Sequence, residues 1–270
     1  MNKLNDEKCI ADKNLPLSPW WVSGYTDGEG SFMINTFKTK NTLVGYTVKL
    51  IYQITVHKSD EALLHAIKLF FKNVGNIEYT ADKQYVSYRV YKLSDIVKVI
   101  IPHFTEYPLQ STKFVSFYLF KAVAELMSKK LHLTIPGYRE VLSYKAASKK
   151  GLEANVFKLG LFSDIIPFNV EGILKESTRS PSETKLEPDY VSGFTAADGS
   201  FFIQKPSVST KWPNYDATFS IAQNKRDADL LKRIALTLGC GRIKTDSNDM
   251  HYLAVRNKEE MQTKIVPSFL

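Results

Sequence analysis

The chain contains two copies of one sequence pattern, and this duplication limits its possible folds more than any other feature does. The segment SGYTDGEGSFMI (residues 23–34) is matched by SGFTAADGSFFI (residues 192–203). Further segments match in the same order: YQITVHKSDEALLHAI with FSIAQNKRDADLLKRI, GNI with GRI, and IPHF with VPSF. Matches in one shared order indicate a duplicated domain whose copies are related by a pseudo-twofold axis.

Each copy is predicted to contain a helix, two long strands, a second helix and two shorter strands. The first helix of each copy is entered through a proline, Pro19 or Pro188, which is a favoured residue at the first helical position. Apolar and polar residues alternate over 45–57, as they do in a strand with one face on a core. Apolar residues at helical spacing predict helices at 60–72, 113–127, 137–147 and 228–238. The expected fold class is α+β, with helices covering one face of each antiparallel sheet.

The duplication also divides the chain into segments. We expect a flexible lead-in over residues 1–17, a first repeat over 18–150, a joining segment over 151–187 and a second repeat over 188–270. The part KESTRSPSETKLE (175–187) is polar, contains proline and has no apolar periodicity, which is typical of a linker. The first repeat continues through more helices after IPHF, whereas the second stops at VPSFL. The second repeat is therefore expected to be truncated at its C-terminus, with only the 228–238 helix covering its sheet.

Composition narrows the classes of function. Lysine and arginine total 36 against 28 acidic residues, and the net charge of +8 favours a polyanionic partner such as nucleic acid. No apolar run is long enough to span a bilayer, so we expect no membrane role. The only cysteines, Cys9 and Cys240, lie in no CxxC pattern, which argues against a zinc site or a disulfide framework. The N-terminus lacks the apolar core of a secretory signal, so we expect the protein to work where it is synthesised, in a reducing compartment.

Two segments resemble a known motif. VSGYTDGEG (22–30) and VSGFTAADG (191–199) are similar to the LAGLIDADG motif, and Ser-Phe follows each of them. The stretch HLTIPGYREVLSYKAASKKG (132–151) is similar to one in single-chain members of this family from fungal organelles. The chain therefore resembles a LAGLIDADG homing endonuclease of the single-chain, two-repeat type.

This resemblance implies both a fold and a function. The fold would be two pseudo-symmetric αββαββα repeats whose saddle-shaped antiparallel sheets hold double-stranded DNA. The function would be that of a monomeric, intron-encoded nuclease that hydrolyses phosphodiester bonds in both strands of a long recognition site. Divalent cations, Mg²⁺ above all, would be the cofactor, and the mitochondrion would be the location of an organelle-encoded protein.

The motif has a physical interpretation of its own. Gly24 and Gly28 give the first helix a stripe almost without side chains, and the second helix has the same stripe, so two helix backbones can approach closely. Glu29 and Asp198 then lie side by side at the negative ends of the two helices. Paired carboxylates repel each other unless they are protonated or share a cation, and hard divalent cations suit phosphodiester hydrolysis. We interpret both acids as catalytic metal ligands; the alternative is that they merely end two helices.

The match to the family is imperfect in ways that concern the site. The first acid of the motif is Asp27 in one copy and Ala196 in the other, and we interpret Asp27 as mainly structural. Members of the family place glutamine, lysine or arginine around the metals. By this resemblance Gln223 and Lys113 are candidate catalytic residues, whereas the first copy has Val56 at the glutamine position.

The strand faces turned away from the core are predicted to bind DNA, because a two-stranded ribbon fits the major groove. Base contacts in the first repeat are expected from Ser31, Met33, Asn35, Phe37, Lys49, Gln53, Thr55, Ser87, Arg89 and Tyr91. In the second repeat they are expected from Ser200, Phe202, Gln204, Thr218, Ser220, Arg242, Lys244, Tyr252 and Arg256. Phosphate contacts are expected from the loop residues Lys38, Lys40, Lys211 and Lys225. The alternative is an ordinary solvated sheet face.

Three functions are compatible with these features. The first is an active DNA endonuclease. The second is an RNA-binding maturase that stabilises a group I intron without cutting it, and the third is a non-catalytic component of a ribonucleoprotein. The paired acids favour the endonuclease, because a pure binding protein needs no carboxylates facing a phosphate backbone. The expected incomplete second repeat favours the other two.

Overall fold

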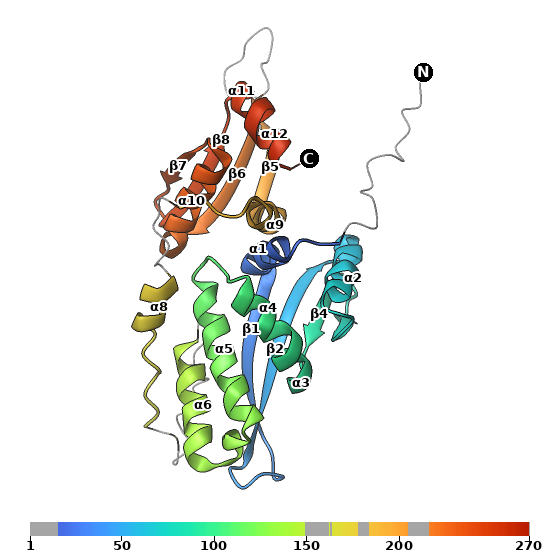
Figure 1. The fold of residues 1–270 in the computed structure, drawn as a ribbon, viewed down its shortest axis with the longest axis vertical. Coiled ribbons are helices and arrows are strands. Elements are labelled where there is room, and N and C mark those ends of the chain that lie inside the picture. The colour runs from blue at the N-terminus through green and yellow to red at the C-terminus, as the bar shows by residue number, and fades with distance from the viewer. Residues whose placement is uncertain (1–15, 149–161, 163, 178–183, 205–215, 270) are drawn as a thin grey trace.

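The structure is a computed structural model that describes residues 16–148, 162, 164–177, 184–204 and 216–269. It consists of two α+β units, which meet through helices α1 (Pro19–Glu29) and α9 (Pro188–Asp198) (Figure 1). Each unit contains a four-stranded antiparallel sheet, which confirms the expected fold class. Among the described residues, no helix has the length and apolar character needed to cross a membrane. Most of the expected lead-in, Lys211 and part of the expected linker lie outside the described residues.

The first repeat follows the predicted order and adds helical turns after its last strand. After α1 come β1 (Gly30–Lys38), β2 (Tyr46–His57), η1 (Lys58–Asp60), α2 (Glu61–Phe70), β3 (Asn76–Tyr79) and β4 (Tyr85–Val90). The chain continues through α3 (Leu93–Asp95), η2 (Ile96–Ile100), α4 (Ile101–Glu106), α5 (Lys113–Ser128), η3 (Leu131–Leu133) and α6 (Ile135–Ala147). Ile96, Ile100 and Phe104 have no exposed surface, so the helical turns before α5, which the sequence analysis did not predict, belong to the core.

The second repeat has the same arrangement of strands. After α9 come β5 (Gly199–Gln204), β6 (Asp216–Asn224), η5 (Lys225–Asp227), α10 (Ala228–Leu238), β7 (Arg242–Thr245), β8 (Met250–Val255), α11 (Lys258–Glu260), η6 (Met261–Ile265) and α12 (Val266–Ser268). The two sheets have the strand orders β1-β2-β4-β3 and β5-β6-β8-β7. Gly30 pairs with Ile54 as Gly199 pairs with Ile221, so the two copies share one register.

Strand β2 shows the alternation that the sequence predicts. Leu50, Tyr52 and Ile54 are at most 1% exposed and lie on the face that the helices cover. The ring of Phe32, from β1, contacts those of Phe104, Phe117 and Phe120 on α4 and α5. We call the opposite face of each sheet, turned away from the core helices, its open face.

Part of the joining segment packs against the first repeat, although the polar end of the segment predicts a linker. Phe162 and Ile165 are buried in the core of the first repeat, and the ring of Phe162 lies edge-on to that of Tyr138, with 5.2 Å between ring centroids. Helix α8 (Glu171–Ser177) then packs against α5 and buries Ile173. Apolar residues in the first part of this segment therefore attach it to the first repeat.

The covering of the second sheet differs from the prediction. Helix α10 does not cover it alone, because Ile265 is fully buried and the ring of Phe269 contacts that of Phe219, with 5.8 Å between centroids. The final residues are helical and reach back onto the sheet. Even so, Phe201 and Ile203, on the core side of β5, are 58% and 73% exposed, whereas their counterparts Phe32 and Ile34 are 9% and 7% exposed.

Candidate active site

Helices α1 and α9 contact each other through their backbones. A Cβ atom built at Gly24 would lie 2.1 Å from the carbonyl oxygen of Tyr190, and one at Gly193 would lie 2.0 Å from that of Trp21. One helical turn further along, a Cβ at Gly28 would lie 2.3 Å from the Cβ of Ala197. Only a stripe of very small residues lets the two helix backbones approach this closely. The structure therefore contains the helix pair that the motif predicts.

The two candidate acids lie at the adjacent ends of this helix pair. Glu29 is the last residue of α1 and Asp198 the last of α9, and each helix passes directly into the first strand of its sheet. A Cβ at Gly28 would be 3.5 Å from Oδ1 of Asp198, so the Asp198 carboxylate reaches across to the end of α1. Partial burial raises the pKa of both carboxyls, and the charge of Asp198 raises the pKa of Glu29 further. The site concentrates negative charge where two helix dipoles already disfavour it.

Lys113 brings the positive charge nearest to this pair. It is the first residue of α5, and its Nζ donates hydrogen bonds to the carbonyl oxygens of Gly28, at 2.7 Å, and Thr26, at 3.0 Å. These carbonyls belong to the last turn of α1, where a cation is favoured. The charge of Lys113 also lowers the pKa of both Glu29 and Asp198, against the effect of burial. The structure thus brings together three of the four predicted catalytic residues.

The fourth, Gln223, lies beside Asp198 only. Its Nε2 donates a hydrogen bond of 2.6 Å to Oδ2 of Asp198 from strand β6, and this bond lowers the pKa of the carboxyl. The equivalent position in β2 is held by Val56, which is buried and has no donor. The two acids therefore differ in their surroundings: Asp198 is oriented by an amide, and Glu29 has no such neighbour at the matching position.

The donor set at the helix ends suits a hard cation. Among the described residues, no group of three or more His, Cys, Asp or Glu side chains gathers in a way that could hold a metal ion. Glu29 and Asp198 supply two carboxylates, so a cation here would take its further ligands from water, backbone carbonyls or a bound phosphate. Mg²⁺ and Ca²⁺ accept such all-oxygen sets and commonly retain water ligands. Binding of a cation between the two carboxylates would be favourable because it relieves their mutual repulsion.

Asp27, the other acid of the motif, has a structural role, as expected from its absence in the second copy. It is buried, and its Oδ2 accepts hydrogen bonds from the backbone N–H groups of Gln110, at 2.6 Å, and Ser111, at 2.9 Å, and from the hydroxyl of Tyr190, at 2.6 Å. With its oxygens occupied in this way, Asp27 fixes the turn before α5 to the helix pair.

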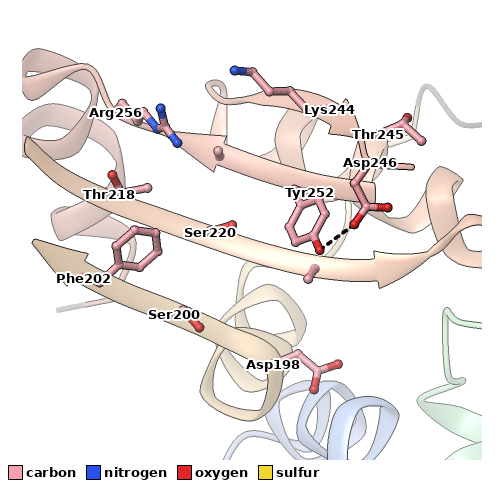
Figure 2. A pocket seen from close by; sticks show the side chains of 12 residues that line it. Asp198, Ser200, Phe202, Thr218, Ser220, Lys244, Thr245, Asp246, Tyr252 and Arg256 are labelled. Atoms are coloured by element: carbon pink, nitrogen blue, oxygen red, sulfur yellow. Dashed lines mark hydrogen bonds between the residues drawn. The ribbon is translucent and has the colours of Figure 1, made fainter. Parts of the chain in front are cut away.

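The open face of the second sheet forms a groove that ends at Asp198. The groove has a volume of about 500 Å³ and is lined by polar and basic side chains from all its strands (Figure 2). Lys244 lies on the edge strand β7, Arg256 directly follows the inner strand β8, and Asp198 lies directly before β5. Tyr252 donates a hydrogen bond of 3.1 Å to Asp246 at the same face (Figure 2). A ligand that follows this groove would reach the acidic pair.

The open face of the first sheet carries side chains that hold one another in place. Nε of Arg89 donates to Oε1 of Gln53, and Nη1 donates to Oε2 of Glu78, both at 2.7 Å. The amide of Gln53 donates in turn to Thr55, also at 2.7 Å. This face therefore presents an arginine whose orientation is fixed before any ligand binds.

Two further residues of this face, Glu78 and Asn76, were not predicted from the sequence. Glu78 pairs with Arg89, and Asn76 donates a hydrogen bond of 2.6 Å to the hydroxyl of Tyr91, whose ring lies 4.5 Å from Nζ of Lys49. Both missed residues lie on β3. The GNI and GRI match could have revealed them, because it aligns them with Arg242 and Lys244, which were predicted to bind DNA.

Two predicted DNA-contacting residues are buried, which corrects their assignment. Ser87 is 2% exposed and shares a hydrogen bond of 2.8 Å with Thr55, and Thr218 is 1% exposed and pairs in register with Phe202. Both side chains therefore offer almost no surface to a base, although Thr218 is among the residues that line the groove. The following predicted residues keep surface on the open faces or in the adjoining loops: Ser31, Met33, Asn35, Phe37, Lys38, Lys40, Lys49, Gln53, Thr55, Arg89, Tyr91, Ser200, Phe202, Ser220, Lys225, Arg242, Lys244, Tyr252 and Arg256. Gln204 lies on β5, but its side chain is outside what the structure describes.

The fold and site define a class: a two-repeat α+β protein with a carboxylate pair at its internal helix interface, between two open sheet faces. The family model described as "LAGLIDADG endonuclease" matches residues 22–124 and 191–270, and the chain belongs to this family. It is similar to the "Probable intron-encoded endonuclease 2" of Neurospora crassa, with 32% identity over 230 residues. The match covers 84% of this chain and 49% of that protein, so the chain spans about half the length of this curated relative.

Solved structures of a meganuclease share the fold. The I-SmaMI LAGLIDADG homing endonuclease bound to cleaved DNA matches with a TM-score of 0.82 and 34% identity, over 94% of this chain and 82% of that one. I-SmaMI bound to an uncleaved DNA target in the presence of calcium ions matches with a TM-score of 0.82 and 33% identity, over 94% and 84% of the two chains. The expected fold of two related repeats, each with an antiparallel sheet, is thereby confirmed.

Proposed function

We propose that the chain is a site-specific DNA endonuclease that hydrolyses phosphodiester bonds in both strands of a long recognition site. The observation that carries the proposal is the position of Glu29 and Asp198, paired at the ends of α1 and α9. A carboxylate pair between two open sheet faces can bind cations for phosphodiester hydrolysis. A protein that only binds nucleic acid would gain nothing from these negative charges. Membership of the LAGLIDADG endonuclease family and the likeness to a DNA-bound meganuclease support the proposal.

Each residue of the site has a chemical task in this proposal. Glu29 and Asp198 would hold divalent cations, Mg²⁺ in the cell, which supply Lewis acidity for phosphodiester hydrolysis when bound. The amide of Gln223 fixes the rotamer of Asp198 through its 2.6 Å hydrogen bond. The ammonium group of Lys113, held on the last turn of α1, places a positive charge where phosphate oxygens would become more negative during cleavage.

The two open faces would bind the two halves of the DNA site. The first face offers an oriented arginine, Arg89, and the second offers Lys244 and Arg256 in a groove. Arginine and lysine can donate to guanine edges in the major groove, while the exposed residues Lys38, at the end of β1, and Lys225, directly after β6, suit phosphates. Because one chain carries both faces, a monomer would suffice for the whole site.

We also propose the domain boundaries and the cellular setting of the chain. We place the first repeat at 18–150 and the second at 188–270, joined by 151–187 after a lead-in over 1–17. The name of the Neurospora crassa relative supports an intron-encoded protein, and we propose that the chain is organelle-encoded and acts in the mitochondrion. Group I intron RNA or a ribonucleoprotein would be the partner if the chain acted as a maturase instead.

Selection from randomised duplex DNA tests the proposal. Purified chain is incubated with the pool and Mg²⁺, and molecules cut in both strands are recovered and sequenced. We expect one long asymmetric site to emerge and its cleavage to stop when EDTA removes the metal. A chain that binds group I intron RNA and promotes its splicing, yet yields no cut DNA with Mg²⁺, Mn²⁺ or Ca²⁺, would contradict the nuclease and support the maturase.

A further inference from the structure

The first turn of α5 is held by both repeats at once. Its leading backbone N–H groups all have acceptors: Asp27 accepts from Gln110 and Ser111, and the hydroxyl of Ser111 accepts from Lys113 at 3.0 Å. The N–H between them, that of Thr112, is bound by a residue of the other repeat. Unpaired N–H groups at a helix start need such partners, and carboxylates are the strongest of them.

That residue is Asp227, the last residue of η5, which directly precedes α10 in the second repeat. Its Oδ1 accepts the backbone N–H of Thr112 at 2.7 Å, and its Oδ2 accepts the Thr112 hydroxyl at 3.1 Å. Asp227 is only 8% exposed, and apart from this contact its Oδ2 lies 3.6 Å from Nε of the neighbouring Arg226. Its counterpart in the first repeat, Asp60, is exposed and makes no side-chain cap. The burial of Asp227 is therefore specific to the contact between the repeats.

A second contact between the repeats holds the same turn. Nη1 of Arg233, on α10, donates a hydrogen bond of 2.9 Å to Oε1 of Gln110, and its Nε donates one of 3.1 Å to the carbonyl of Thr184. Arg233 is 8% exposed, and the residue aligned with it in the first repeat is Ala66. Residues 110 and 112 are thus both fixed by the second repeat.

Lys113 follows this turn directly. Its amine lies on the carbonyls of Gly28 and Thr26, at the end of α1, while its backbone begins α5 immediately after Thr112. The side chain is therefore anchored at the amine by the first repeat, and the turn that carries it is anchored by both repeats, through Asp27 and Asp227. A shift of the turn would move the ammonium group relative to Glu29 and Asp198.

We propose that Asp227 is a positioning residue for Lys113, through which docking of the second repeat places the lysine at the acidic pair. The expected effect on cleavage rests on the proposed function. The position of Lys113 can be tested without it. Arg233 assists by holding Gln110. The site would then have a correctly placed lysine only while the two repeats are docked.

The main test replaces Asp227 in the full chain. Asp227→Ala removes both bonds to Thr112, and we expect the single-turnover cleavage rate to fall about tenfold at saturating DNA, since small misplacements of catalytic groups cost this much or more. DNA affinity should not change. Asp227→Asn keeps an acceptor for the N–H and a donor for the hydroxyl, so it should recover most of the rate. Asp60→Ala, the counterpart in the first repeat, is the matched control and should cleave at the wild-type rate.

Two further measurements separate positioning from general damage. In a Lys113→Ala background, Asp227→Ala should slow cleavage no further, because its effect acts through the lysine. Labelling of Lys113 by an amine reagent, followed by mass spectrometry, should accelerate several-fold in Asp227→Ala and not in Asp60→Ala, and it needs no cleavage activity. Unchanged labelling, or an undiminished slowing in the Lys113→Ala background, would overturn the inference. If the wild type cuts no DNA, the proposed function fails, and the labelling still decides the inference.

Discussion

Replacing Gly24 by alanine probes the contact between α1 and α9. The new Cβ would lie 2.1 Å from the carbonyl oxygen of Tyr190 and 2.8 Å from the backbone nitrogen of Phe194. Both are backbone atoms of a helix, so neither can rotate away as the end of a side chain could. Relieving the contact to an ordinary 3.4 Å requires the helices to separate by about 1.3 Å, the difference between 3.4 and 2.1 Å. Overpacking of this kind costs roughly 1–3 kcal/mol, and the better helix propensity of alanine returns at most about 1 kcal/mol.

We therefore expect Gly24→Ala to lower the free energy of unfolding by about 1–2 kcal/mol, measured by urea denaturation. Cleavage should fall as well, because the same separation moves Glu29 and Asp198 apart. Gly172→Ala in α8 is the matched control: a Cβ there meets no atom within 4 Å, and we expect stability to be unchanged or to rise by up to about 1 kcal/mol. If Gly24→Ala were as stable as Gly172→Ala, the backbone contact between the helices would be refuted.

Further predictions concern charge, packing and DNA recognition. Burial raises the pKa of Asp198 above its unfolded value, so the charged carboxylate costs stability at neutral pH, and this cost disappears as the pH falls through the folded pKa. Without metal, Asp198→Asn should therefore be more stable than the wild type near pH 7 and lose that advantage near pH 4; an advantage independent of pH would contradict the shift. Backbone amides of β5 should exchange hydrogen faster than those of β1, because Phe201 and Ile203 are 58% and 73% exposed; equal protection would contradict this. Arg256→Ala should relax specificity at one position of the DNA site, with a loss of about 1–3 kcal/mol in binding free energy, and repeating the selection would measure this. Uniform weakening at every position would instead indicate a phosphate contact.

The fold was predictable because the duplication and the periodicity agree. The alternation in β2 and the apolar spacing in α10 are strong signals, and the α10 bounds were predicted correctly at both ends. Phe162 and the η6 residue Ile265 were not placed in a core, because each lies outside the helices and strands that were predicted from periodicity. The packing of such segments is decided by the surfaces available around them, which a pattern along the chain does not describe.

Some residues of the candidate site could be predicted from the sequence, and others could not. Glu29 and Asp198 could be identified because the motif places them at helix ends in both copies. Asp227 could not, because an aspartate before a helix is usually an exposed capping residue, and its counterpart Asp60 is exposed. Its burial depends on how the two repeats dock. The error at Ser87 has a similar cause, since strand alternation gives the face of a side chain but not whether its neighbours cover it.

The most direct measurement is cleavage of the selected DNA site by variants of the acidic pair. We expect Glu29→Gln and Asp198→Asn each to slow cleavage at saturating Mg²⁺ by more than about a hundredfold, beyond the loss usual for partners outside the metal shell. DNA affinity should be unchanged or higher, because each variant removes a negative charge near phosphate. Asp189→Asn, which removes an exposed carboxylate from the other end of α9, should cleave like the wild type. Cleavage at the wild-type rate by either variant of the acidic pair would contradict the assignment of Glu29 and Asp198 as the catalytic centre.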